Sequence, residues 1–235
     1  MSGTTPSTAL MPFLKQLISV PGLSGYESPV RDLIEEAWRP LTDEIHLSRL
    51  GSLHALRRGV SPEPRPGLMI AAHMDAIGLM VTGLIDGFLR VTEVGGLDPR
   101  VLPGQLVVVH ARQDLAGVIV RPPDHLLPED ASPGRMSLDY LLIDTGLLAS
   151  EVERLVRVGD LVSFAQPPLQ LSDEYLAGHS LDNRASVAAV TVCLQQLQGR
   201  QTVWDIWAVA TSQEEETLGG AMTSAFQLRP TLAVA

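Results

Sequence analysis

Apolar and polar positions alternate with two different periods along the chain, and the change of period separates two kinds of structure. In residues 7–19 and again from Ser28 onward, apolar side chains recur every three or four residues, which predicts two amphipathic helices. The Gly- and Pro-containing segment 21–28 separates them, and Ser28 followed by Pro29 is typical of a helix start. Short apolar runs then predict strands at 45–48, 53–55 and 68–72.

Between residues 76 and 165 the pattern changes to short apolar runs separated by Gly, Pro and Asp. Six of these runs read, in chain order, IGLMVTG, GFLRVTEV, GQLVVVHA, LAGVIV, YLLIDTG and GDLVSFA. One helical stretch, at 150–156, interrupts them. Runs of this length and spacing are typical of a small barrel or sandwich, so we predict an inserted all-β domain over residues 76–165.

After residue 165 helices and strands alternate again. The predicted elements are a helix, a strand, a short helix and a final apolar run, at 182–197, 203–210, 218–226 and 232–235. Such alternation on both sides of a β insertion predicts an α/β domain with a mixed sheet, formed by residues 1–75 and 166–235. The final run resembles an unfinished strand, so we expect a chain that is truncated at its C-terminus.

The composition restricts the possible partners and the compartment. An apolar fraction of 45% is ordinary for a folded domain, and a net charge of −10 without a basic run argues against nucleic acid. Because no stretch approaches about 18 apolar residues and no secretory leader is recognisable, we expect no membrane partner. Cys193 is the single cysteine, which excludes a disulfide framework or a thiolate zinc site. These features predict a cytoplasmic protein.

Three clusters of polar residues lie next to predicted strands or helix starts. His73 and Asp75 follow one strand, Glu214 and Glu215 follow another, and Asp182 opens a helix. Ligands in open α/β sheets gather beyond the carboxyl ends of the strands, so we expect the two strand-end clusters to meet. Imidazole and carboxylate groups that converge from separate elements are the ligands of a two-metal hydrolase site.

Each cluster also has a simpler interpretation. The His73-x-Asp75 pair fits a buried histidine near a turn, Asp182 fits a helix N-cap, and the acidic run 214–216 fits a solvated helix start. The residues alone therefore leave several functions open. These are a metal-dependent peptidase, another two-metal hydrolase, a non-catalytic metal-binding scaffold subunit, and a glycosidase, which needs a carboxylate pair and no metal.

Four motifs in chain order resemble the glutamyl and deblocking aminopeptidases, known as TET aminopeptidases, that assemble as hollow tetrahedral particles. The motifs are HMDAIGLMV, DGFLRVTEVGGLDPRVLPGQ, GHSLDNRAS and TSQEEETLGGA. The resemblance implies an α/β metallopeptidase domain with a β insertion and two divalent metal ions, zinc or cobalt, per subunit. It also implies peptide substrates and a homo-oligomer, a dodecamer.

Matched motif by motif, the resemblance implies that His73 ligates one metal, Asp182 bridges both metals and Glu215 ligates the other. It implies that Glu214 is the general base and that Asp75 orients His73. The implied reaction removes an amino-terminal residue by attack of a metal-bridged water, deprotonated by Glu214, on the peptide carbonyl.

The resembled family has two further metal ligands, an Asp directly after the last strand and a later His. We expect both beyond Ala235, in agreement with a truncated chain. The family also has Gly-Leu-Arg-Gly where this chain has Gly219 in place of the arginine and Thr217 in place of the first glycine.

Overall fold

The structure, a computed structural model, describes residues 6–127, 136–173 and 175–235. The chain forms two compact units. The sheet unit comprises Met1–Ala76 and Pro167–Ala235, and the barrel unit comprises Ile77–Gln166. All of the candidate site residues belong to the sheet unit.

The sheet unit contains a five-stranded mixed sheet, as predicted. In spatial order its strands are β1 (Glu44–Leu47), β2 (Leu53–Arg57), β12 (Asp205–Thr211), β3 (Gly67–His73) and β13 (Leu232–Val234). Strands β12 and β13 run parallel to β3, whereas β2 runs antiparallel to both β1 and β12. The parallel pair β3 and β12 therefore ends at the same edge of the sheet, with His73 opposite Thr211.

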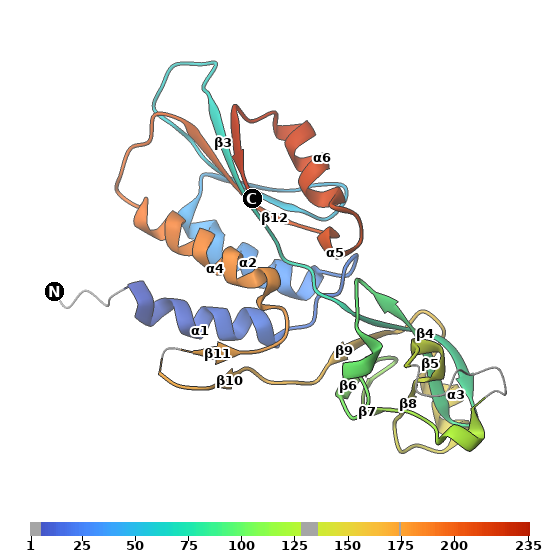
Figure 1. The fold of residues 1–235 in the computed structure, drawn as a ribbon. Helices are drawn as coiled ribbons and strands as arrows, with labels where there is room; N and C mark the ends of the chain where they lie inside the picture. Colours follow the sequence, from blue (N-terminus) through green and yellow to red (C-terminus); the bar gives the residue numbers. More distant parts are fainter. Residues whose placement is uncertain (1–5, 128–135, 174) are drawn as a thin grey trace. The chain divides into compact units, whose positions relative to one another are not determined.

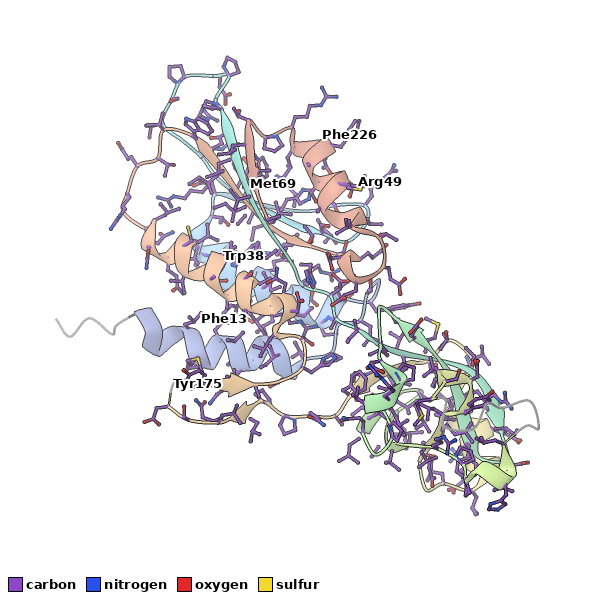
Figure 2. All side chains as sticks on the ribbon, in the orientation of Figure 1. Phe13, Trp38, Arg49, Met69, Tyr175 and Phe226 are labelled. Atoms are coloured by element: carbon purple, nitrogen blue, oxygen red, sulfur yellow. The ribbon has the colours of Figure 1, made fainter. Side chains whose placement is uncertain are left out.

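Helices cover both faces of this sheet (Figure 1). Helices α1 (Pro6–Ser19), α2 (Ser28–Trp38) and α4 (Leu181–Gln196) pack on one face, where Trp38 and the strand residue Ala208 share the main core. Helix α6 (Gly219–Leu228) covers the other face, over Met69 and its neighbours (Figure 2). Apolar side chains thus point to both faces of the central strands, which explains their nearly continuous apolar runs.

The barrel unit is a closed barrel of six strands. Their order around the barrel is β4 (Gly78–Ile85), β5 (Phe88–Val94), β8 (Leu142–Asp144), β7 (Asp114–Val120), β6 (Leu106–His110) and β9 (Leu161–Phe164). Buried aliphatic residues such as Val81, Leu89 and Ile143 fill its interior. The helix α3 (Ala149–Leu155) interrupts the strands as predicted. The sequence-based prediction of an α/β fold carrying a small barrel is confirmed.

The remaining elements are short. They are the hairpin β10 (Leu169–Gln170) and β11 (Leu176–Ala177), the helix α5 (Glu214–Thr217), and 3₁₀ turns at Arg39–Leu41, Pro99–Val101, Asp124–Leu126 and Leu138–Tyr140. None of them has enough residues to produce a recognisable period. Apart from the helix start that was one interpretation of the acidic run 214–216, none was predicted. Of the helices in the described ranges, none combines the length and apolar character needed to cross a membrane.

Candidate metal site

The ends of two parallel strands bring the His73 and Glu214 clusters together. His73 is the last residue of β3, and its register partner Thr211 is the last residue of β12. The chain then turns through Gln213, whose φ of 55° lies in the left-handed region, and enters α5 with Glu214 and Glu215. The expected meeting of these two clusters at one edge of the sheet therefore occurs.

His73 faces carboxylates from two other elements. Its Nε2 lies 3.0 Å from an oxygen of Asp182 and 3.6 Å from an oxygen of Glu214. One ring nitrogen of His73 and one oxygen each of Glu214 and Glu215 lie within 4.8 Å of one another. This set of nitrogen and oxygen donors fits a divalent cation.

Asp75 is buried, with no exposed surface, and it anchors the start of α5. One carboxylate oxygen accepts the backbone N–H of Glu214 and the other accepts that of Glu215, both at 3.1 Å. The Nδ1 atom of His73 lies 3.2 Å from the main-chain carbonyl oxygen of Asp75 and 3.6 Å from its carboxylate. Asp75 therefore contacts His73 and also fixes the segment that carries both glutamates.

Asp182 lies at the start of helix α4, where the backbone departs from helical geometry. The N-cap position belongs to Ser180, and the backbone of Asp182 has a ψ of 108°, which lies outside the helical region. Its carboxylate approaches His73 instead, while 89% of the side chain remains exposed. An exposed carboxylate at this position has oxygens available for a ligand.

The charges of the cluster influence one another strongly. Burial disfavours the charged imidazole of His73, but the carboxylates of Asp75, Asp182 and Glu214 outweigh burial and raise its pKa to about 9. Burial raises the pKa of Glu215, and the neighbouring carboxylates raise it further, whereas His73 lowers it. Burial opposes ionisation of Asp75, yet the hydrogen bonds from His73 and from α5 lower its pKa. A cation would relieve this concentration of negative charge.

Two buried charged residues beside the site were not singled out from the sequence. Arg184 donates to the main-chain carbonyl oxygens of Met74, Leu17, Val20 and Gly22, at 2.9, 2.6, 2.7 and 3.3 Å respectively. Burial lowers the pKa of Arg184 to about 10, although Asp75 opposes this shift. The second residue, Glu27, accepts the backbone N–H of Gln213 at 3.1 Å. The contacts of Arg184 with Met74 and of Glu27 with Gln213 join residues more than a hundred positions apart, so no local sequence pattern predicts them.

Comparisons with known proteins agree with the resemblance carried by the four motifs. The family model described as M42 glutamyl aminopeptidase matches residues 51–235. Lysyl aminopeptidase from Pyrococcus furiosus is 34% identical over 228 residues, which make up 94% of this chain and 64% of that protein. The chain thus spans slightly less than two thirds of the length of this relative.

Solved structures of the same kind superimpose on the chain. A TET aminopeptidase from a marine sediment Thaumarchaeota archaeon has a TM-score of 0.89 and 29% identity, over 96% of this chain and 65% of that one. The TET1 peptidase of Pyrococcus horikoshii, which can assemble into a tetrahedron or a large octahedral shell, has a TM-score of 0.82 and 30% identity, over 95% of this chain and 67% of that one. From the match of the family model over most of the chain, we conclude that the chain belongs to the M42 glutamyl aminopeptidase family.

Proposed function

We propose that this chain carries metal-binding and catalytic residues of a hydrolase that removes amino-terminal residues from short peptides. The observation that carries the proposal is the convergence of His73, Glu214 and Glu215 within 4.8 Å at the ends of two parallel strands. Membership of a family described as glutamyl aminopeptidase supports the interpretation of this cluster as the site of peptide hydrolysis.

In this proposal His73, Asp182 and Glu215 are the ligands of two divalent ions, zinc or cobalt. The family resemblance implies that Asp182 would be the ligand shared by both ions, and its two carboxylate oxygens and 89% side-chain exposure would allow this role. When bound, the ions polarise the scissile carbonyl and acidify the attacking water.

Glu214 acts as the general base. One of its carboxylate oxygens lies 3.6 Å from Nε2 of the ligand His73, and about a third of the side chain is exposed to an arriving substrate. It takes a proton from the attacking water and delivers it to the leaving amine. Asp75 keeps the base and the ligand Glu215 in place because it holds both of their backbone N–H groups.

We further propose that the sheet unit, residues 1–75 and 166–235, is the catalytic domain and that residues 76–165 form an inserted domain. The subunits form a homo-oligomer, and the dodecameric form follows from the family resemblance. The similarity to TET1 peptidase of Pyrococcus horikoshii supports assembly. A cytoplasmic location agrees with the single cysteine, and the net charge of −10 agrees with the lack of a nucleic-acid partner.

The test combines metal content with peptide cleavage. The protein is stripped with a chelator, reloaded with Co²⁺ or Zn²⁺, and incubated with a short peptide that has a free amino terminus; the same peptide in acetylated form is the control. We expect cleavage of the free peptide only, lost with the chelator and restored by metal. Glu214→Gln should reduce turnover by about 10²-fold or more while the metal content is kept.

Each alternative has a distinct outcome. Metal binding without cleavage of any peptide would favour the scaffold subunit. Cleavage of a glucan that continues in the chelator would favour a glycosidase, since that reaction uses carboxylates alone. Loss of metal in Glu214→Gln would mean that Glu214 is a ligand and that the roles assigned to Glu214 and Glu215 must be exchanged.

A further inference from the structure

Glu27 is a buried carboxylate that is bonded to the backbone leading into the metal site. It lies between α1 and α2, and 5% of the residue is exposed. The residue occupies the N-cap position of α2, but its side chain does not cap that helix. Its Oε1 atom instead accepts two backbone N–H groups, from Gly25 at 2.7 Å and from Gln213 at 3.1 Å.

Gln213 is the residue at which the chain turns toward the site. Its φ of 55° and ψ of 37° are left-handed, a conformation that residues other than glycine rarely adopt. Its N–H is the first of three successive N–H groups, and the next two, of Glu214 and Glu215, are bonded to Asp75. Two buried carboxylates, Glu27 and Asp75, thus hold three consecutive amides.

The two carboxylates belong to segments that are themselves joined. The N–H of Ser24 donates to the carbonyl oxygen of Ala76 at 3.2 Å, and the N–H of Ala76 donates to that of Gly22 at 3.0 Å. Leu23, between them, is buried and forms a bridge with Ala76. The loop that carries Glu27 is therefore fixed to the segment that follows β3 and carries Asp75.

We propose that Glu27 is a positioning residue that holds the left-handed turn at Gln213 and thereby directs Glu214 and Glu215 toward the metal ions. This inference rests on the proposed function, because it concerns how the base and one ligand are held. Groups that orient metal ligands commonly change metal affinity by about 10- to 100-fold when they are replaced. A residue that only contributes to the core would change the stability of the fold and leave the ligands in place.

The first measurement is amide hydrogen exchange in the metal-free protein. Glu27→Met keeps the length of the side chain but removes the oxygen that accepts the N–H groups of Gly25 and Gln213. Ile34→Val is the matched control, since Ile34 is fully buried on α2 and the substitution removes one methylene from the core. We expect Glu27→Met to accelerate exchange at the amides of 213–215 by about tenfold or more relative to the control. Equal exchange in the two variants would overturn the proposal.

The second measurement is the affinity for Co²⁺, determined by calorimetry on the wild type and both variants. We expect Glu27→Met to weaken binding by about 10- to 100-fold and Ile34→Val to leave it unchanged. If the wild type binds Co²⁺ and Glu27→Met binds it within about twofold, the positioning role is refuted while the proposed function stands. If the wild type binds no metal, the proposed function fails, and exchange at 213–215 alone decides whether Glu27 holds the turn.

Discussion

His54 should make the folded protein less stable as the pH falls below neutrality. It lies on β2 with no exposed surface, and its Nε2 is 2.8 Å from the hydroxyl of Ser224 on α6. Within the described residues Nδ1 has no hydrogen-bond partner. The protonated imidazole would have to leave a buried N–H unpaired, and burial lowers the pKa of His54 from 6.5 to about 4, with a further contribution from His46.

The sign and the size of the effect follow from this shift. Between pH 6.5 and pH 4 the unfolded chain binds a proton at His54 that the folded chain does not bind. The free energy of unfolding therefore falls as the pH is lowered through this range and levels off below pH 4. A difference of 2.5 pKa units, from 6.5 to about 4, corresponds to roughly 3 kcal/mol.

The assay is urea unfolding at several pH values between about 7.5 and 4, for the wild type and for His54→Gln. Glutamine does not titrate, and its amide can still bond to the hydroxyl of Ser224. Other titrating groups contribute equally to both proteins, so the difference between the two curves isolates His54. We expect the wild type to lose roughly 3 kcal/mol more than the variant over this range. Parallel curves would refute the reasoning.

Three further outcomes are expected. Arg184→Met removes the donor from four carbonyl oxygens, three of them in buried contacts, and should lower the free energy of unfolding by roughly 3–5 kcal/mol, measured by urea titration. Asp75→Asn presents an N–H donor where an N–H acceptor is needed and should weaken Co²⁺ binding by about 10- to 100-fold in calorimetry. Gly220→Ala would put a Cβ atom 2.1 Å from the carbonyl oxygen of Ser212 and should lower the melting temperature sharply, whereas Gly96→Ala, which meets no atom within 4 Å, should leave it nearly unchanged.

The fold was predictable where a segment is long enough to show its period. The strand 68–72 and the helix 182–197 have clear apolar patterns, and the structure has β3 and α4 there. The four-residue helix α5 is a single turn with no period to detect, and only the acidic run 214–216 indicated a helix start there. It is separated from α6 by Leu218, whose left-handed φ of 56° nothing in the local pattern indicates.

The candidate site was predictable as a set of residue types at strand ends, but its internal contacts were not. Local rules assign Asp182 to a helix N-cap, whereas its carboxylate lies 3.0 Å from the imidazole of His73, more than a hundred residues away in sequence. The same holds for Arg184 and Glu27, whose partners are main-chain atoms of distant segments. Main-chain atoms are the same in every residue, so a single sequence carries no signal for such contacts.

The three buried charges of Asp75, Glu27 and Arg184 share one property: their hydrogen bonds go mainly to the backbone. Hydrogen bonds to backbone amides and carbonyls replace the water that these charged side chains lose on burial. The carboxylates that line the site are therefore not needed as their partners. Asp182 and Glu214 consequently keep exposed surface. Since the backbone bonds set where the chain turns, replacing one of these three residues should move the ligands without changing their chemistry. Replacing one of these residues should therefore change the affinity for a given metal ion more strongly than the preference for one metal ion over another.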